Sequence, residues 1–265
     1  MPALVWGSLA TLLKWWISVY GNINDSLALS MRQPIRLYVN APLSTGQDVP
    51  ATPAHAHYLG SVMRQGVGDR VLLFNGIDGE WSARIALLRK ERATFAIERQ
   101  TRPSAPESDL WLLFAPLKRD ATDLLVQKAT ELGVSCLVPV LTERTNSNRV
   151  NLSRLVAIAT EAAEQSERLT VPSIWTPQNL QDMLHSWPSG RVLEVAVERS
   201  SGRPLGNPQG PAALLIGPEG GFTRSEVDLL VRHPFVQVAS LGPRILRAET
   251  AAIVGLALLQ ATSGG

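Results

Sequence analysis

The sequence is short of cysteine, with Cys136 alone in 265 residues. One cysteine excludes a disulfide framework, and together with four histidines it gives no spacing typical of a zinc site. His55 and His57 lie two positions apart, which is too few ligands to hold a metal. Cys136 falls within an apolar run, residues 135–141, that predicts a strand, so we expect a small buried side chain rather than a nucleophile. We expect no bound metal.

A strong charge of either sign is missing as well, because the formal net charge is only +2. This excludes a polybasic binder as a description of the whole chain. The charge is unevenly divided: residues 31–103 carry ten Lys and Arg against six Asp and Glu, a net of +4, whereas residues 104–265 carry fourteen against sixteen. A basic first region suits a nucleic-acid partner, although a difference of this size also arises by chance.

Two patterns of predicted secondary structure divide the chain. Residues 31–103 are β-rich, with strong turn signals at Asn75-Gly76 and Asp78-Gly79, and a linker rich in Pro and Ser follows at 101–108. From Leu110 onward, strands alternate with helices, which predicts a parallel sheet with helices on both faces. The predicted strands are 35–39, 68–74, 80–88, 93–99, 110–115, 135–141, 191–197, 212–216 and 235–240. The predicted helices are 55–65, 119–132, 152–168 and one that starts at 248.

Two loops rich in Gly and Pro, residues 217–221 and 241–247, each follow a predicted strand. Loops at the carboxyl ends of parallel strands form the ligand crevice, so we expect one site with two walls. Thr223 and Glu226 form a capping box that starts a helix. The first loop fits neither G-x-G-x-x-G nor a P-loop, and Glu219 would repel a phosphate. Glu219 would suit a sulfonium, an ammonium or ribose hydroxyls; the alternative is a plain tight turn between a core strand and a helix.

The two motifs together resemble those of a known family. Residues 215–223 read Leu-Ile-Gly-Pro-Glu-Gly-Gly-Phe-Thr, and residues 241–251 read Leu-Gly-Pro-Arg-Ile-Leu-Arg-Ala-Glu-Thr-Ala. They closely resemble the 16S ribosomal RNA uracil-N3 methyltransferases, which belong to the SPOUT superfamily of S-adenosylmethionine (SAM) enzymes. Either motif alone is moderate evidence, whereas both in this order are highly specific. The resemblance extends from Met31 to the C-terminus.

This resemblance implies a fold, partners and an activity. The implied fold is α/β: a SPOUT-type parallel sheet with a C-terminal trefoil knot over residues 108–265, preceded by a PUA-like or OB-like β-barrel over residues 31–103 that helps to hold RNA. The implied assembly is a cytoplasmic homodimer with its two sites at the subunit interface. The implied activity is transfer of a methyl group from SAM to N3 of a uridine in 16S rRNA of the small ribosomal subunit.

The resemblance also implies the residues of the site. The expected cofactor-binding residues are Ile216, Gly217, Pro218, Glu219, Gly220, Gly221, Leu241, Gly242, Ile245, Leu246 and Thr250. The expected RNA-binding residues are Arg36, Arg64, Lys118, Arg119, Lys128, Arg144, Gln165 and Arg168, with Arg70 and Arg84 as further candidate phosphate contacts. For the arginines of 31–103, an ordinary solvated side chain is the alternative.

The reaction class assigns tasks to three of these loop residues. Uracil N3 is a weak acid, so an enzyme must remove its proton and stabilise the negative charge that develops on the carbonyl oxygens. Arg247, beside the expected cofactor, is our candidate for stabilising that charge. Glu219 or Glu249 is the candidate base, which would require a raised pKa. Water is an alternative base, and Glu249 could instead serve only its own helix.

Three other functions stay open on the sequence alone. A superfamily enzyme acting on another rRNA or tRNA nucleotide is disfavoured by the match at 241–250. A non-catalytic RNA-binding ribosome-assembly protein is disfavoured by the intact Gly220, Gly221 and Arg247. A dinucleotide dehydrogenase is disfavoured by the missing glycine fingerprint.

Residues 1–30 do not resemble the rest of the chain. Residues 4–20 are apolar apart from Lys14, but this run is slightly short for a bilayer span and lacks the basic start and cleavage site of a signal peptide. The segment that begins at Met31 resembles the family's natural start. We therefore expect an over-called start codon or a poorly ordered extension, with a membrane anchor or an amphipathic surface helix as alternatives.

Overall fold

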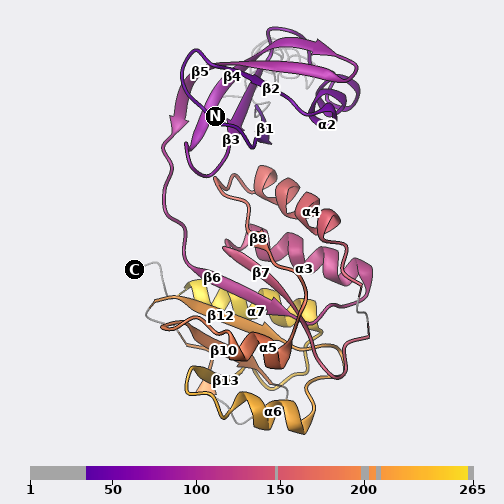
Figure 1. Ribbon diagram of the computed structural model, residues 1–265, viewed down its shortest axis with the longest axis vertical. Helices are drawn as coiled ribbons and strands as arrows, with labels where there is room; N and C mark the ends of the chain where they lie inside the picture. The colour runs from indigo at the N-terminus through magenta and orange to yellow at the C-terminus, as the bar shows by residue number, and fades with distance from the viewer. Residues whose placement is uncertain (1–33, 147–148, 198–202, 207–209, 262–265) are drawn as a thin grey trace, which may run out of the picture.

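The structure, a computed structural model, describes residues 34–146, 149–197, 203–206 and 210–261. Its elements form two domains, one above the other in Figure 1. We call residues 34–102 the β domain and residues 110–261 the α/β domain. The extension 1–30 lies outside the described residues. None of the helices in the described part of the chain has the length and apolar character that a bilayer crossing needs.

The β domain is built on a five-stranded sheet with the order β1-β3-β4-β5-β2. The strands are β1 (Ile35–Tyr38), β2 (Asp48–Pro50), β3 (Arg70–Phe74), β4 (Glu80–Arg89) and β5 (Arg92–Arg102). β1 and β3 are parallel, and the other pairs are antiparallel. A short helix, α2 (Pro53–His57), continues into a π-helical turn, η1 (Tyr58–Val62). The inward side chains of the strands, such as Leu73, Ile85 and Phe95, form one buried core.

The α/β domain is built on a sheet with the order β11-β13-β10-β12-β6-β7-β8. The strands are β6 (Leu110–Phe114), β7 (Cys136–Leu141), β8 (Ser173–Ile174), β10 (Val192–Ala196), β11 (Arg203–Pro204), β12 (Ala212–Ile216) and β13 (Val236–Ser240), with β9 (Gln178–Asn179) paired to β7. All of these pairings are parallel. The predicted parallel sheet is therefore confirmed.

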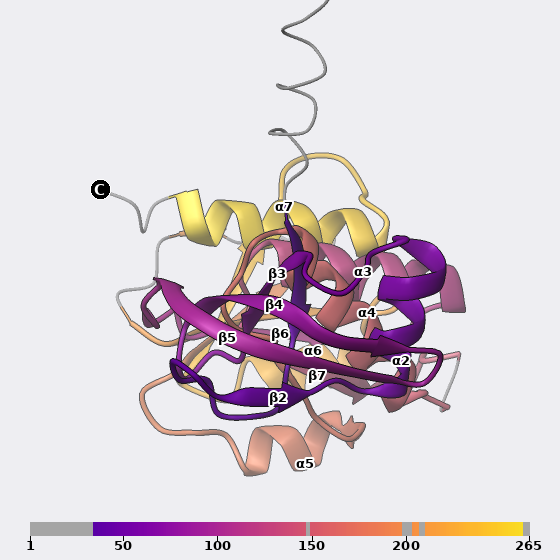
Figure 2. The ribbon, with the colours of Figure 1, turned by 90° about the horizontal axis from the view of Figure 1, so that it is seen from above.

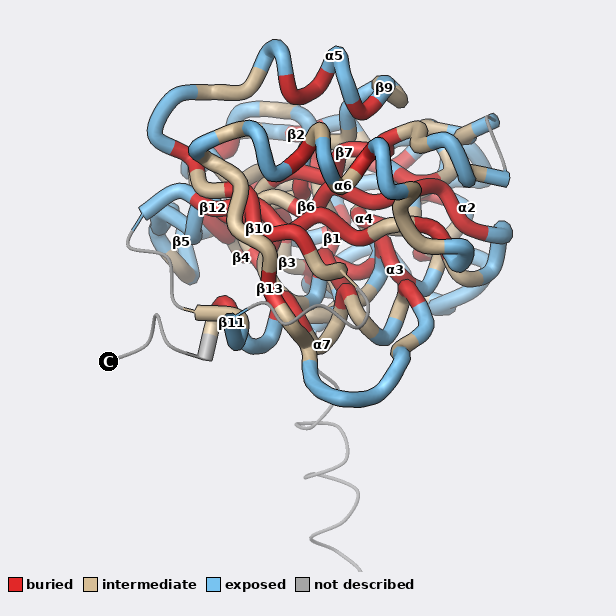
Figure 3. Tube along the Cα trace, turned by 90° about the horizontal axis from the view of Figure 1, so that it is seen from below, coloured by how far each residue is buried: buried red, intermediate tan, exposed pale blue. Residues whose placement is uncertain are grey.

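Helices cover both faces of this sheet, which gives three layers (Figure 2). The helices on one face are α3 (Arg119–Glu131), α4 (Leu152–Gln165) and α7 (Ala248–Ala261), and those on the other are α5 (Leu180–His185) and α6 (Arg224–Leu230). Leu112 and Phe114 of β6 pack into the first helix layer, whereas Leu113 between them packs into the second. The central strands are therefore buried on both faces (Figure 3), which is why they read as continuous apolar runs.

The structure corrects some predicted boundaries. β5 runs to Arg102 and takes up the first two residues of the predicted linker. α4 ends at Gln165, three residues early, because Glu167 has a φ of 60°, which an α-helix does not accommodate. β2 and α5 escaped prediction because three and six residues are too few to display a period. Cys136 is buried, as expected.

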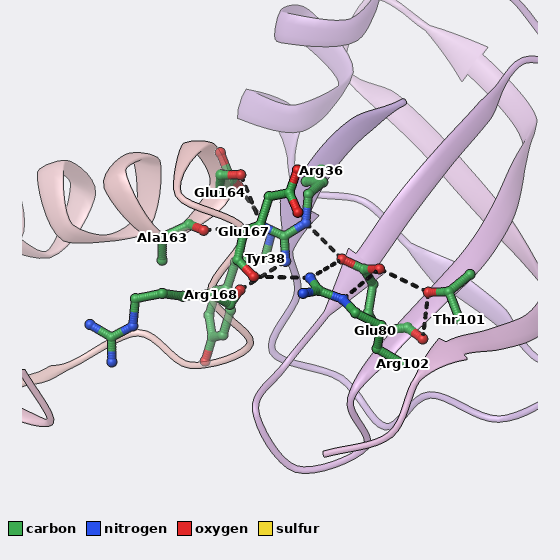
Figure 4. A network of polar contacts seen from close by, with 9 residues as sticks. All are labelled: Arg36, Tyr38, Glu80, Thr101, Arg102, Ala163, Glu164, Glu167 and Arg168. Atoms are coloured by element: carbon green, nitrogen blue, oxygen red, sulfur yellow. Dashed lines mark hydrogen bonds and ion pairs between the residues drawn. The ribbon is translucent and has the colours of Figure 1, made fainter. Parts of the chain in front are cut away.

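A buried arginine joins the two domains (Figure 4). Arg36 of β1 has a side chain that is 7% exposed, and its Nε donates to Glu80 at 2.7 Å. Its terminal nitrogens donate to the backbone carbonyls of Ala163, Glu164 and Arg168, at 3.0, 2.9 and 2.8 Å. The last carbonyls of a helix have no partner inside it. An arginine of the β domain thus caps the C-terminal end of α4 in the α/β domain.

Two further contacts strengthen this junction. Arg102, at the end of β5, donates to Glu80 at 2.6 Å and to the carbonyl of Glu167 at 2.9 Å. The backbone N–H of Tyr38 donates to the Glu164 carboxylate at 2.9 Å. The end of α4 is therefore bonded to both β1 and β5, and these contacts set the orientation of the β domain.

Candidate active site

The two predicted loops line one cavity of about 590 Å³ at the carboxyl end of the parallel sheet. The first loop, between β12 and α6, contributes residues 217–222, and the second, between β13 and α7, contributes 241, 242 and 244–247. A third segment, Ala196 and Val197 at the end of β10, was not predicted. β10 lies between β12 and β13 in the sheet, so its end falls between the two loops. Loop composition alone does not reveal that strand order.

The first loop is shaped by its glycines and by the helix that follows it. β12 is buried along its whole length, and the chain turns directly after it, with the Gly221 N–H donating to the Pro218 carbonyl at 2.8 Å. Gly221 has a φ of 67°, a conformation that favours glycine. A Cβ on Gly217 would lie 2.9 Å from the ring of Phe222. The predicted capping box of Thr223 and Glu226 is present and starts α6.

The second loop is exposed and leads into the N-terminal end of α7. Gly242 has a φ of 110°, which side chains other than glycine rarely adopt. Arg247 immediately precedes α7, and its carbonyl accepts from the Ala251 N–H at 2.8 Å as the first helical turn forms. The backbone of this loop and the N-terminal end of α7 therefore form one wall of the cavity.

Four charged side chains border the cavity, and all are exposed. Glu219 belongs to the first loop, Arg244 and Arg247 to the second, and Arg144 to the loop after β7. Arg144 Nη1 donates to the Gly220 carbonyl at 2.7 Å, so it lies against the glycine loop. The cavity thus offers one carboxylate for a cationic or hydroxyl-bearing group, and three guanidinium groups for an anion or a developing negative charge.

Most of the expected loop residues meet in this cavity. Ten of the eleven expected cofactor residues line it, and Thr250 does not. Glu219 and Arg247 line it as well, whereas Glu249 does not. Glu249 lies half-buried in the first turn of α7, where a carboxylate is stabilised by the helix dipole. This position agrees with the alternative in which Glu249 serves only its own helix and is not the base. Arg244 lines the cavity without having been singled out, although it lies in the same motif.

Two expected RNA contacts are corrected by the structure. Arg36 is buried at the domain junction, where carbonyls and Glu80 take up its donors. Arg168 has a side chain that is 7% exposed and donates to the carbonyls of Thr130 and Val134 at 2.7 and 3.0 Å. Both side chains cap the ends of helices, and neither reaches the surface where a phosphate could lie. The sequence does not distinguish a buried arginine from an exposed one.

The other expected RNA contacts differ in their surroundings. Arg84 of β4 pairs with Glu98 of the neighbouring strand β5, and Arg70 of β3 reaches the same Glu98 across β4. Lys128 pairs with Glu131 at 2.9 Å. The exposed candidates are Arg64, Lys118, Arg119, Arg144 and Gln165. Among the described residues, no three His, Cys, Asp or Glu side chains gather as a metal site would require.

Comparison with known proteins supports an RNA-modifying fold. Residues 104–260 match the family model of an RNA methyltransferase domain, and residues 52–98 match that of an RNA methyltransferase PUA domain. A ribosomal RNA small subunit methyltransferase E from Rickettsia conorii is 34% identical over 235 residues, covering 84% of this chain and 93% of that protein. The chain belongs to the ribosomal RNA small subunit methyltransferase E family. The resemblance inferred from the two loop motifs is confirmed.

Other members of this family agree in sequence and in structure. A ribosomal RNA small subunit methyltransferase E from a Synechocystis species is 34% identical, covering 90% of this chain and 81% of that protein. The crystal structure of a ribosomal RNA small subunit methyltransferase E from Neisseria gonorrhoeae bound to S-adenosyl methionine has 30% identity and a TM-score of 0.80. It covers 87% of this chain and 98% of that chain. The match therefore includes both domains of the fold.

Proposed function

We propose that this protein transfers a methyl group from SAM to N3 of a uridine in 16S rRNA, and that the target is the family's uridine 1498. One observation carries the proposal. The glycine loop with Glu219 and the second loop with Arg247 line a single cavity. That arrangement places a carboxylate for a cationic cofactor and a guanidinium for an anionic transition state around the same space.

The residues of the cavity fit SAM. A volume of about 590 Å³ lies within the range of roughly 300–1,000 Å³ typical of small-molecule sites. Apolar side chains of Ile216, Leu241 and Leu246 would pack on the adenine, and the exposed Glu219 would face ribose hydroxyls or the sulfonium. Gly220 and Gly221 let the backbone approach the cofactor closely. When bound, SAM supplies the reactive methyl group.

The protein's own task is orientation and charge stabilisation. Uracil N3 must lie in line with the transferred methyl group and must lose its proton. Arg247 would donate to a uracil carbonyl oxygen as negative charge develops there. The proton would leave to Glu219 or to water. Glu249 does not line the cavity, which favours Glu219 or water over Glu249 as the base.

RNA recognition would use exposed cations on both domains. The exposed cations are Lys118 and Arg119 at the start of α3, Arg144 at the cavity and Arg64 of the β domain. The half-buried Lys128 and the exposed, neutral Gln165 are further proposed contacts. An rRNA target is recognised through its shape and its unstacked bases, which suits two domains held in a set orientation. An enzyme acting on the small ribosomal subunit would work in the cytoplasm.

We further propose that the protein is a homodimer. The helix α7 has three polar residues in its 14, Glu249, Thr250 and Gln260, and helices that are apolar all round are normally buried. On the same face of the sheet, Leu124 of α3 and Val156 of α4 are 39% and 46% exposed. A second copy of this chain would cover that apolar surface. A molar mass of one subunit by light scattering would contradict this.

The trefoil knot remains a proposal as well. β10 precedes β12 and β13 in the chain but lies between them in the sheet, and β11, which lies between β10 and β12 in sequence, pairs on the outer side of β13. α7 then returns to pack on β12, where a Cβ on Gly255 would lie 2.6 Å from Leu214. This strand order and the return of α7 to β12 are what a knot in the C-terminal segment would require.

The decisive experiment is methyl transfer onto small ribosomal subunits from a strain that lacks its own enzyme of this family. Labelled SAM, nuclease digestion and mass spectrometry would identify the product. We expect 3-methyluridine at one position of 16S rRNA. A methyl group on another nucleotide would favour a different specificity within the superfamily. RNA binding without transfer would favour a non-catalytic assembly protein.

A further inference from the structure

Glu226 makes a contact that a helix cap does not require. Its Oε2 accepts from the Thr223 N–H at 2.8 Å, which completes the capping box of α6. Its Oε1 accepts from the backbone N–H of Glu143 at 2.8 Å, although Glu143 is 83 residues away in sequence. The carboxylate is buried, with 5% of the residue exposed. One side chain therefore bonds the loop after β12 to the loop after β7.

The second of these loops carries Arg144, the residue next to Glu143. The loop closes on itself, with Thr145 Oγ1 accepting from the Thr142 N–H at 2.9 Å. Ser225 Oγ donates to Glu143 Oε1 at 3.1 Å. Side chains of α6 therefore bond both the backbone N–H and the side chain of Glu143. Arg144 then reaches across to the Gly220 carbonyl at 2.7 Å and lines the cavity.

We infer that Glu226 is a positioning residue for the methyl-transfer site: it holds the loop 142–145 so that the guanidinium of Arg144 lies against the glycine loop at the cavity. The inference rests on the proposed function and extends it, because it assigns a task to a residue that does not line the cavity. The competing explanation is that Glu226 only caps α6. That explanation makes no use of the bond to Glu143.

The chemistry of the carboxylate separates the two roles. Both Glu226 oxygens accept from backbone N–H groups, and a glutamine has one oxygen acceptor and one NH₂ donor. Glu226→Gln can therefore keep the helix cap or the bond to Glu143, but not both, and its NH₂ would face an N–H donor. Thr223→Ala is the matched control. It removes the 3.2 Å bond from the Glu226 N–H, which is the other half of the capping box, and the 2.9 Å contact between the Thr223 and Ser225 hydroxyls. Both hydrogen bonds that the Glu226 carboxylate accepts, from the N–H groups of residue 223 and of Glu143, are kept.

The experiment measures single-turnover methyl transfer, SAM affinity and thermal stability for Glu226→Gln, Thr223→Ala, Arg144→Ala and the double variant Glu226→Gln/Arg144→Ala. We expect Glu226→Gln to slow transfer about tenfold, because a buried N–H is left without an acceptor. We expect Thr223→Ala to slow it less than about threefold despite a similar loss of stability. If Glu226 acts through Arg144, adding Glu226→Gln to Arg144→Ala should change the rate by less than about twofold.

Amide hydrogen exchange of the full-length variants gives a readout that does not depend on transfer. Exchange in the segment 142–145 should accelerate in Glu226→Gln and stay unchanged in Thr223→Ala. Unchanged exchange in Glu226→Gln would show that the bond from Glu226 to the Glu143 N–H does not hold the loop 142–145. Effects of Glu226→Gln and Arg144→Ala that multiply, or a Thr223→Ala rate as low as that of Glu226→Gln, would overturn the positioning role. A wild-type protein that transfers no methyl group would contradict the proposed function and the positioning role together. The exchange experiment would still show whether Glu226 holds the loop 142–145.

Discussion

Arg36 and Glu80 form an ion pair at 2.7 Å with side chains 7% and 5% exposed, at the boundary between the β domain and α4. Burial raises the pKa of Glu80, but hydrogen bonds from Arg102, Arg36 and Thr101 outweigh it, so the pKa lies below its usual 4.5. The carboxylate therefore stays charged at neutral pH and holds two arginines. The stability it contributes is present above pH 4.5 and is lost as the pH falls through the lowered pKa.

Arg36→Ala should destabilise the protein by about 3–5 kcal/mol, because it removes one of the two arginines that pair with the buried Glu80 and uncaps the end of α4. Denaturant unfolding of wild type and variant would measure the loss. Arg36→Lys is the control, since it keeps the charge but lacks the planar fork that reaches several carbonyls, and it should rescue only part of the stability.

RNA binding distinguishes this structural role from the RNA contact expected from the sequence. The dependence of rRNA affinity on salt should be unchanged in Arg36→Ala, measured where the variant is folded. Removing an exposed phosphate contact, as in Arg64→Gln, should lower the slope of log affinity against log salt by about 0.7–0.9. A reduced slope in Arg36→Ala would restore Arg36 as an RNA contact.

Glu164→Gln should leave the protein as stable or make it more stable at neutral pH. Burial raises the pKa of Glu164 above 4.5, and the hydrogen bond from the Tyr38 N–H offsets only part of this rise. Keeping the carboxylate ionised at neutral pH therefore lowers the stability of the folded protein. The amide oxygen can still accept from Tyr38. The advantage of the variant should shrink as the pH falls through the raised pKa and vanish below about 4.5, where folded and unfolded carboxyls are both protonated. Melting temperatures at a series of pH values test this, and an advantage that grows in acid would contradict it.

Gly221→Ala should weaken SAM binding more than it weakens the fold. Gly221 and Gly190 have φ values of 67° and 81°, and a Cβ on either would meet no atom within 4 Å, so an alanine adds comparable strain at both. That strain is about 1–2 kcal/mol. Gly221 lines the cavity, whereas Gly190 lies in the turn before β10 and does not. Calorimetric titration with SAM should show a loss for Gly221→Ala alone, and equal losses in both variants would remove Gly221 from the cofactor site.

Arg247→Ala should keep SAM affinity and lose methyl transfer. A donor that acts only as charge develops on the uracil should affect kcat more than KM, by about a hundredfold or more. Arg244→Ala, in the same loop and also lining the cavity, is the control for a general loss of positive charge. Single-turnover rates and melting temperatures of both variants decide the matter. A destabilised Arg247→Ala protein with near-normal turnover would leave Arg247 with a structural role.

The parts of the fold that the sequence predicted are those with a local signal. β12 and the loop after it were recognised because five consecutive apolar residues end at a cluster of glycines, and α6 because Thr223 and Glu226 have the spacing of a capping box. The short β2 and α5 lack such a signal. α4 was predicted too long because the left-handed conformation of Glu167 leaves no mark on composition.

The sequence by itself determined the alternation of strands and helices and the two loops of the site, because apolar periodicity, capping and glycine content act over a few residues. Tertiary structure decided which arginines are buried. Arg36 and Arg64 are both arginines of the same basic region. Arg36 caps a helix by bonding a carbonyl 127 residues away, whereas Arg64 is exposed. It also decided that β10 separates β12 from β13, which brings Val197 into the cavity. Burial and strand order depend on which distant segments pack together, and that packing is a property of the whole chain.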